Sequence, residues 1–429
     1  MPKKTISRSA AALKSALSAD KLDALGLQTG QSQRLRVVTP SRLALTILAA
    51  FGSGSVESIA DLLREFNFRY GTNTAYKAFY NRLAHDGFAV FMKALVGHLL
   101  SEFAVRTLGP SAGAAIEDFE DIVIQDGSSF VVKESLRSAF PGRFKNVEPA
   151  AVELHATFSG FLDEVTDVTL TADKEGERQF LPKAEALEGK LLLADRGYPS
   201  LAYFLELCDA NASFVMRLSR TYKPWVTAVH HANAVERPAQ PLGLAEFIAS
   251  RPRGVPMDID VEFRRAPGKT FRLVLMPGKD KWMTRLCTNM PRERFPLALV
   301  AQLYRFRWQI ELVFKEWKSY ANLHRFDTGN AHIAEGFIWA SLAAAVLKRF
   351  IAHTAQATTE VAISTRKVAM CAQIFLRDLC SAVGASLRRL TTVLRGIVRF
   401  LEGNATRANP QKEQRVGRLS VGLVPVHVS

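Results

Sequence analysis

Three carboxylates, widely separated along the chain, could together carry out metal-dependent chemistry. Asp126 follows the apolar run 122–124, Asp195 follows the apolar run 190–194, and Glu311 lies in a segment with helical periodicity. Carboxylates that follow strands are well placed to point into one crevice. Two aspartates and a glutamate supply the oxygen ligands that two Mg²⁺ ions require, and Mn²⁺ could substitute. Two such metal ions activate an attacking oxygen and stabilise a leaving one, which is the chemistry of phosphoryl transfer.

Each aspartate also has a simpler interpretation. Asp126 precedes Gly127, and Asp195 precedes Arg196-Gly197, so both segments resemble turns. An aspartate beside a glycine commonly caps a turn and has no other role. The combination of the two aspartates with the glutamate favours a metal site over two unrelated turns.

The segment 303–318 predicts a helix with a polar stripe beside its apolar face. At about 100° per residue, an arc of about 60° holds four polar side chains: Tyr304, Arg307, Glu311 and Lys318. The apolar residues fall on the neighbouring face. Tyr304 and Lys318 would lie about 21 Å apart along the axis, too far for one small ligand. The stripe could instead follow several phosphates of a nucleic acid, although a solvated face with helix salt bridges is the alternative.

The charge distribution favours a polyanionic partner. The 429 residues include 56 Lys and Arg against 41 Asp and Glu, which gives a net charge of +15. Residues 1–115 hold 14 basic and 7 acidic side chains, and residues 300–429 hold 18 and 8. The segment between them is slightly acidic. Basic ends can neutralise phosphates while a central acidic part holds metal ions. A basic protein without a nucleic-acid role remains the alternative.

Hydrophobic periodicity predicts an α/β protein with helical ends. We expect a helical region at 1–115 and the first part of an α/β core at 116–219. A β-rich insertion follows at 220–292, where apolar and polar residues alternate with the period of a strand. The segment 293–335 would complete the core with the Glu311 helix. A helical region and a polar, fraying tail would occupy 336–429.

Two short helices near the start of the chain could read DNA. Residues 55–66 and 72–83 have helical spacing, and Ser55 is a candidate N-cap. The second helix carries Lys77 and Arg82, so the pair could be a helix-turn-helix with a basic second helix. An ordinary helical pair with aromatic core residues is equally compatible with the pattern.

Other features indicate where the protein works. The start of the chain has no apolar stretch typical of a secretory signal. The apolar run 337–347 is too short to span a bilayer, and we interpret it as a buried helix or a helix at a dimer interface. The four cysteines have neither zinc-ligand nor disulfide spacing. We therefore expect a cytoplasmic protein with free thiols and no membrane partner.

The spacing Tyr304-x2-Arg307-x3-Glu311-x6-Lys318 resembles the Y-R-E-K signature of the insertion sequence four family of bacterial DDE transposases. The segments IQDGSSF around Asp126 and LLLADRGY around Asp195 look like the first and second acidic motifs of that family. The resemblance covers roughly residues 30 to 350. That family also carries a β-strand insertion between its second aspartate and its glutamate, which agrees with the 116 residues from Asp195 to Glu311.

This resemblance implies a ribonuclease-H-like core in which Asp126, Asp195 and Glu311 hold two metal ions. Arg307 and Lys318 would grip DNA phosphates near the cleaved end. The resemblance also implies that Tyr304 contacts the DNA backbone. Trp282 of the insertion would stack on a base flipped out of the duplex, although it could instead be an ordinary core tryptophan. The implied partners are double-stranded DNA, as terminal inverted repeats and target, and a second copy of the chain in a synaptic complex.

The implied reaction is cut-and-paste DNA transposition. Water would attack the phosphodiester at the element end, and the freed 3′-hydroxyl would form and reopen a hairpin before it attacks target DNA. Two alternatives remain: a DNA-binding regulator that does not cut, and another ribonuclease-H-like nuclease. The complete set of three carboxylates argues against the regulator, and the Y-R-E-K spacing argues against the other nuclease.

Overall fold

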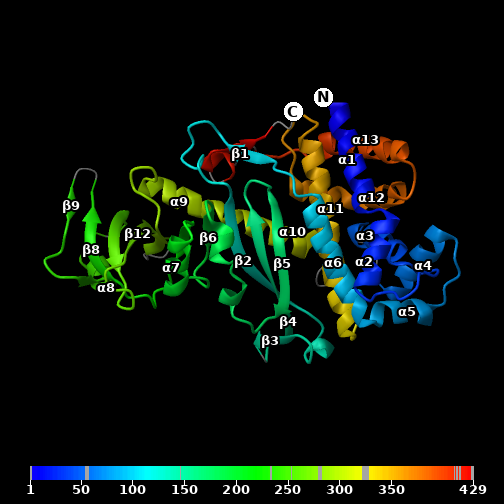
Figure 1. The fold of residues 1–429 in the computed structure, drawn as a ribbon, viewed down its shortest axis with the longest axis horizontal. Helices are drawn as coiled ribbons and strands as arrows, with labels where there is room; N and C mark the ends of the chain where they lie inside the picture. Colours follow the sequence, from blue (N-terminus) through cyan, green and yellow to red (C-terminus); the bar gives the residue numbers. More distant parts are fainter. Residues whose placement is uncertain are drawn as a thin grey trace.

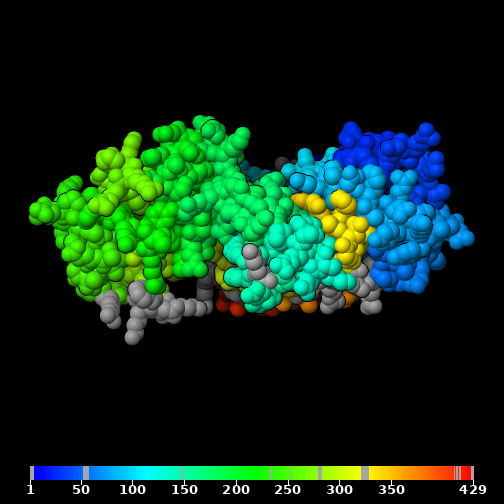
Figure 2. Space-filling view, turned by 90° about the horizontal axis from the view of Figure 1, so that it is seen from below, coloured from blue at the N-terminus to red at the C-terminus, as the bar shows by residue number. Residues whose placement is uncertain are grey.

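A computed structural model shows an elongated molecule, with helices gathered at one end and a β-rich lobe at the other (Figures 1 and 2). The structure describes residues 2–53, 58–144, 146–231, 234–252, 254–278, 283–320, 328–409, 411, 414 and 417–426. A mixed α/β part lies between the two ends, and it positions the carboxylates.

Five strands form the centre of the molecule: β2 (Ile122–Val131), β4 (Glu148–Ser159), β5 (Glu164–Ala172), β6 (Leu191–Ala194) and β7 (Ser213–Arg217). Their order across the sheet is β5-β4-β2-β6-β7. The strands β2, β6 and β7 are parallel, whereas β4 is antiparallel to both β2 and β5. Every residue of β6 is buried, as expected for a short apolar strand that is covered on both faces.

The β-rich lobe continues the same sheet. Its elements are β8 (Trp225–His230), β9 (Val235–Glu236), β10 (Leu242–Gly243), α8 (Leu244–Ala249), β11 (Met257–Glu262), β12 (Thr270–Pro277) and β13 (Met283–Thr288). β13 pairs antiparallel with β7, so the lobe joins the central strands in one 12-stranded sheet. The alternation expected in β11 is confirmed, since Ile259 and Val261 are fully buried while Asp258 pairs with Arg272 at 2.6 Å.

The two ends of the chain form one helical body. The N-terminal helices are α1 (Pro2–Ala16), α2 (Ala19–Gln28), α3 (Pro40–Ser53), α4 (Ile59–Tyr70), α5 (Tyr76–Ala84) and α6 (Asp86–Glu102). The C-terminal helices are α11 (Ala331–Gln356), α12 (Thr365–Val383) and α13 (Leu387–Asn404). α11 packs on α6 and α3, α12 packs on α3, and α13 packs on α1. The helical regions expected at opposite ends of the sequence are therefore neighbours in space (Figure 1).

The apolar run 337–347 lies in the centre of this body. All of its residues are buried within α11. Within the described residues, α11 is the single continuous helix that is long and apolar enough to cross a membrane, and 83% of its most apolar window is buried inside the protein. The hypothesis that this run supplies a dimer interface is wrong, because the chain's own helices already cover it.

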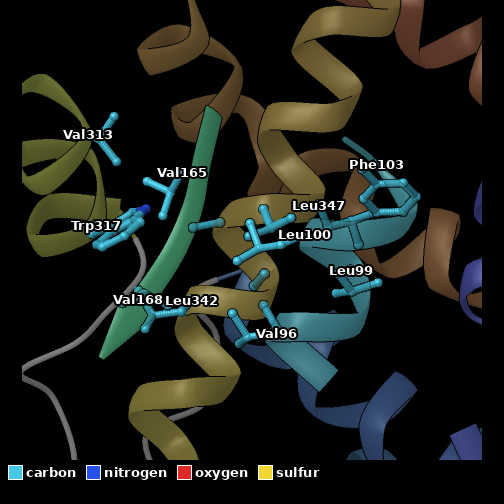
Figure 3. Packing of buried hydrophobic residues seen from close by; sticks show 14 of the residues in the cluster. Val96, Leu99, Leu100, Phe103, Val165, Val168, Val313, Trp317, Leu342 and Leu347 are labelled. Carbon is cyan, nitrogen blue, oxygen red and sulfur yellow. The ribbon is translucent and has the colours of Figure 1, made fainter. Parts of the chain in front are cut away.

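A shared hydrophobic core connects the helical body to the helix that carries Glu311. Figure 3 shows Val165 and Val168 of β5 between Val313 on α10 (Trp308–Tyr320) and side chains of α6 and α11 such as Leu342. These residues belong to one continuous cluster. The position of α10 is therefore fixed by a sheet strand on one side and, through that strand, by the long central helix.

The C-terminal tail is more ordered than its composition predicts. β14 (Leu423–Pro425) pairs antiparallel with β1 (Leu108–Pro110), and Leu423 is fully buried. The expectation of a fraying tail is wrong for this segment, because its backbone pairs with β1. The other elements are β3 (Pro141–Phe144), α7 (Leu201–Asp209), α9 (Leu297–Phe306) and short 3-10 turns at Glu134–Leu136, Glu177–Phe180, Ala184–Leu187 and Leu419–Val421.

Candidate active site

Asp126 lies in the middle of β2 and not at its end. The strand continues to Val131, and Asp126 pairs across the sheet with Ala156 of β4. The turn expected at Asp126-Gly127 is therefore absent. Gly127 has a packing role instead, because a Cβ there would lie 2.9 Å from Oε1 of Glu153. The glycine lets a buried carboxylate approach the strand beside Asp126.

Asp195 follows β6 directly, as the apolar run before it predicts. β6 is the parallel neighbour of β2, and Gln125 is level with Ala194 in the register. The two aspartates therefore lie beside each other on adjacent strands. The hydroxyl of Tyr304 donates a hydrogen bond to Oδ1 of Asp195 at 2.9 Å, and Nη1 of Arg217 lies 3.7 Å from the same oxygen.

The segment that carries the polar stripe consists of two helices. α9 ends at Phe306, α10 begins at Trp308, and Arg307 lies in the turn between them. The expectation of one straight helix through 303–318 is wrong, because the backbone tightens here: N–H of Arg307 donates to the carbonyl of Tyr304 at 3.1 Å. Tyr304, Arg307 and Glu311 nevertheless still reach the two aspartates.

Arg307 connects two of the three carboxylates. Nη1 donates to Oδ2 of Asp126 at 2.6 Å, and Nη2 donates to Oε1 of Glu311 at 2.6 Å. Only 11% of the Arg307 side chain is exposed, against 16% for Asp126 and 27% for Glu311. Short bonds between charged partners at this depth are strong. The guanidinium thus holds a strand residue and a helix residue in one place.

The electrostatics of the site reflect a cluster of like charges around one cation. Burial raises the pKa of Asp126 to about 6, against the lowering effect of Arg307, and the charges of Asp195 and Glu311 raise it further. Although burial disfavours its charge, the neighbouring carboxylates, with Asp126 foremost, raise the pKa of Arg307 above its usual range. Additional positive charge would therefore stabilise the ionised carboxylates.

The donor set suits a hard divalent cation, although the carboxylates are arranged around Arg307. Asp126, Asp195 and Glu311 offer oxygen ligands of the kind that Mg²⁺ prefers. Within the described part of the chain, no three His, Cys, Asp or Glu side chains are grouped closely enough to hold an ion as they lie. The guanidinium of Arg307 supplies the charge compensation that a cation would otherwise supply.

Lys318 lies farther along α10 and contacts the same strand as Asp126. Its Nζ donates to the carbonyl of Ser129 at 2.6 Å, and burial lowers its pKa. In this structure Lys318 therefore connects α10 to β2 and lies apart from the three carboxylates.

A buried polar group beside Asp126 was not anticipated from the sequence. Glu153 and His155 are almost fully buried on β4, and burial raises the pKa of Glu153 to about 7. Burial also lowers the pKa of His155 to about 4. Nδ1 of His155 and the hydroxyl of Tyr198 lie near Gly127, and neither has a hydrogen-bond partner among the described residues. The signal in the sequence was that Glu153 and His155 alternate with apolar residues along the predicted strand.

A second buried ion cluster fixes the far side of α10. Nη2 of Arg349 on α11 donates to Oδ1 of Asp163 at 2.8 Å, and its Nη1 lies 3.8 Å from Glu316 of α10. Asp163 also pairs with Arg418 at 2.9 Å and accepts from His353 at 3.2 Å. The cluster joins α10, α11, the β4–β5 connection and the tail. We found no sequence pattern that predicts it.

The N-terminal candidates occupy different environments. Lys77 is exposed on α5, whereas Arg82 is half-buried and its Nη1 lies 3.4 Å from the carbonyl of Gln31. α4 begins after Ser58, whose side chain accepts from N–H of Asp61, and Ser55 lies outside the described residues. α4 ends at Tyr70, and its C-cap Gly71 has a φ of 60°, which suits glycine, so a tight connection to α5 is present.

Trp282 also lies outside the described residues, so its stacking role stays a prediction.

Comparison with known proteins identifies the family. The model for the transposase DDE domain matches residues 117–347, more than half of the chain. The chain belongs to this family of transposases. The matched range contains all three carboxylates, the β-rich lobe and the two helices around Arg307. The expectation of a DDE transposase of an insertion sequence is confirmed.

Similar proteins are named as transposases of insertion sequence elements. The transposase for insertion sequence element IS231B of Bacillus thuringiensis subsp. berliner is 20% identical over 355 residues, which covers 71% of each chain. That of IS231D from Bacillus thuringiensis subsp. finitimus is 20% identical over 378 residues and 77% of each chain. The putative transposase InsL for IS186A of Escherichia coli (strain K12) is 40% identical, but over 62 residues, 14% of this chain and 17% of that relative.

A solved piggyBac transposase synaptic complex with hairpin DNA resembles the transposase with a TM-score of 0.46 and 12% identity. The match covers 94% of this chain and 86% of that one.

Proposed function

We propose that this transposase cleaves DNA at the ends of an insertion sequence and joins the resulting 3′-hydroxyl ends to target DNA, with Asp126, Asp195 and Glu311 as its catalytic carboxylates. The observation that carries the proposal is their convergence. The residues lie on β2, after β6 and on α10, and 185 positions separate the first from the last. Arg307 and Tyr304 nevertheless contact all three.

The strand arrangement supports a ribonuclease-H-like core. The order β5-β4-β2-β6-β7, with β4 antiparallel between β2 and β5, places β2, which carries Asp126, beside β6, which precedes Asp195. The β-rich lobe then enters between β7 and α9. We propose the corresponding division of the chain: an end-binding region at 1–115, core segments at 116–219 and 293–335, an insertion at 220–292, and a C-terminal region at 336–429.

Two Mg²⁺ ions, when bound to the three carboxylates, would activate the attacking oxygen and stabilise the leaving one. The protein's own contribution is to hold the carboxylates and to supply positive charge. Arg307 neutralises Asp126 and Glu311, and we propose that it turns to a DNA phosphate when other cations compensate them. Tyr304 would orient Asp195, and Lys318 would contact the DNA backbone beside β2.

The spacing of Tyr304, Arg307, Glu311 and Lys318 supports assignment to the Y-R-E-K subgroup of the insertion sequence four family. In line with that assignment, we propose that α5 reads the element ends through Lys77. The contacts of Arg82 make its role structural as well, because it holds α5 against the loop after α2. A homodimer on paired ends and a stacking role for Trp282 remain part of the proposal, although α11 cannot supply the dimer interface.

A cleavage assay tests the proposal. Duplexes that contain the DNA flanking the gene, with and without Mg²⁺, would be incubated with the transposase and with a Glu311→Gln variant. Metal-dependent cuts at the element boundary by the wild type alone would support it. Equal binding of the ends by both proteins, without any cleavage, would instead indicate a regulator.

A further inference from the structure

A row of exposed arginines lies on α13. This helix has an apolar face, formed by Leu390, Leu394, Ile397, Val398 and Leu401, all of them buried. With Arg388 at 0°, a turn of about 100° per residue places Arg395 near 340° and Arg399 near 20°. All three are exposed. We call these residues the α13 arginine stripe.

The stripe lacks compensating charge. Within the described part of the chain, none of its three guanidinium groups has an ion-pair or hydrogen-bond partner. The one acidic residue of α13 is Glu402, near its C-terminal end, and the neighbouring helix α1 has no acidic residue at all. Unpaired arginines on one line raise the local potential more than the same charges would if scattered among carboxylates.

The helix that carries the stripe is firmly held. α13 packs on α12 and α1, and Nζ of Lys14 on α1 donates to the carbonyls of Val383 and Ala385 at the start of the connection to α13. Oγ1 of Thr354 on α11 donates to Oγ of Ser9 on α1 at 3.1 Å. The stripe is therefore presented on a supported scaffold, which reduces the entropy lost when a ligand binds.

The chemistry of the stripe selects phosphates over a second copy of the chain. In a two-fold symmetric contact the same patch meets itself, so three uncompensated arginines would face three others. Guanidinium groups instead match phosphate oxygens in pairs of parallel hydrogen bonds. Arg388 and Arg399 lie about 16 Å apart along the helix axis. One strand of duplex DNA presents a phosphate about every 3.4 Å of its axis, so this length spans about five phosphates.

We propose that the α13 arginine stripe is a sequence-independent binding surface for the phosphate backbone of duplex DNA, separate from the carboxylate site and from α5. The proposal rests on the proposed function, because it adds a contact to the same DNA partner. The stripe and the proposed end-binding region belong to the same helical body, because α13 packs on α1. One DNA duplex could therefore contact both.

The test measures how salt weakens binding to a duplex of unrelated sequence. The first variant replaces Arg388, Arg395 and Arg399 with alanine, and the second replaces all three with lysine, which keeps the charge. The control replaces three surface arginines that already have carboxylate partners, Arg251, Arg294 and Arg377, with alanine. All variants carry substitutions at surface positions, and circular dichroism would verify their folding. The control loses the same formal charge as the first variant.

The logarithm of the association constant falls linearly as the logarithm of the salt concentration rises, with a slope of about −0.9 for each phosphate contact. For the alanine stripe variant, which loses three contacts, this slope should be less steep by about 2.7. The affinity advantage of the wild type should then shrink about 40-fold between 50 and 200 mM salt. The lysine variant and the control should keep nearly the wild-type slope.

An unchanged slope for the alanine variant, or an equal loss in the control, would overturn the proposal. A loss of binding to phosphatidylserine vesicles with an unchanged DNA slope would also overturn it, in favour of a membrane surface. Metal-dependent cleavage at element ends is measured in parallel. If the wild type cleaves while the stripe variant keeps its slope, only the stripe assignment fails. If the wild type neither binds nor cleaves DNA, the proposed function fails as well.

Discussion

Arg307→Ala should separate two roles that the Y-R-E-K spacing alone cannot distinguish: metal binding and charge compensation. Arg307 makes 2.6 Å bonds to Asp126 and to Glu311, both of which are largely buried. Its removal leaves two carboxylates without their cation. We expect the metal-free variant to be less stable by about 2 to 4 kcal/mol, toward the lower part of the range for breaking a buried ion pair because Glu311 is partly exposed.

A divalent cation should offset this loss. Because Arg307 no longer competes for the same oxygens, Mn²⁺ should bind the variant at least as tightly as the wild type. A tenfold tighter site would return about 1.4 kcal/mol. Strand cleavage should nevertheless fall, because a phosphate contact is lost. Calorimetric titration with Mn²⁺ measures the affinity, and Glu311→Gln is the control that loses a ligand. If Arg307→Ala lost Mn²⁺ binding as fully as Glu311→Gln, the reasoning would be refuted.

Three further predictions concern stability and DNA binding. Arg349→Leu should destabilise the protein by about 3 to 5 kcal/mol because it leaves buried carboxylates unpaired, whereas Arg377→Ala, on an exposed pair, should cost less than about 1 kcal/mol; equal denaturation midpoints would contradict this. Because the pKa of Glu153 is raised to about 7, its contribution to stability is complete below about pH 4.3 and is lost as pH rises through about 7. Glu153→Gln should therefore flatten this decline of the melting temperature with pH. An unchanged decline in the variant would show that Glu153 does not cause it. Lys77→Ala should weaken end-specific binding at unchanged thermal stability, while Arg82→Ala should lower both; the reverse pattern in gel-shift and melting experiments would argue against α5 as the reading helix.

The strands and their carboxylates could be predicted because local patterns determine them. The apolar run before Asp195 gives a buried strand, and the alternation around Ile259 gives a half-buried one. Helical spacing likewise predicted that Tyr304, Arg307 and Glu311 would act together, and they do meet the two aspartates.

Features that depend on tertiary partners could not be predicted in this way. Asp126-Gly127 resembles a turn in sequence, but the antiparallel partner β4 keeps the strand extended to Val131. The turn at Arg307 has neither proline nor glycine to signal it. The tail pairs with β1, more than 300 residues earlier, and Asp163 meets Arg349 across a sequence separation of 186 residues. Such contacts join positions that no periodicity connects.

The most direct test of the account is the metal dependence of cleavage at the element end by the three conservative carboxylate variants, Asp126→Asn, Asp195→Asn and Glu311→Gln. Each change keeps the size of the side chain and removes its charge. We predict that the wild type cuts the flanking duplex with Mg²⁺ and not without it, and that each variant binds the duplex normally but does not cut it. Cleavage near the wild-type rate by any one variant would contradict the assignment of that carboxylate to the site.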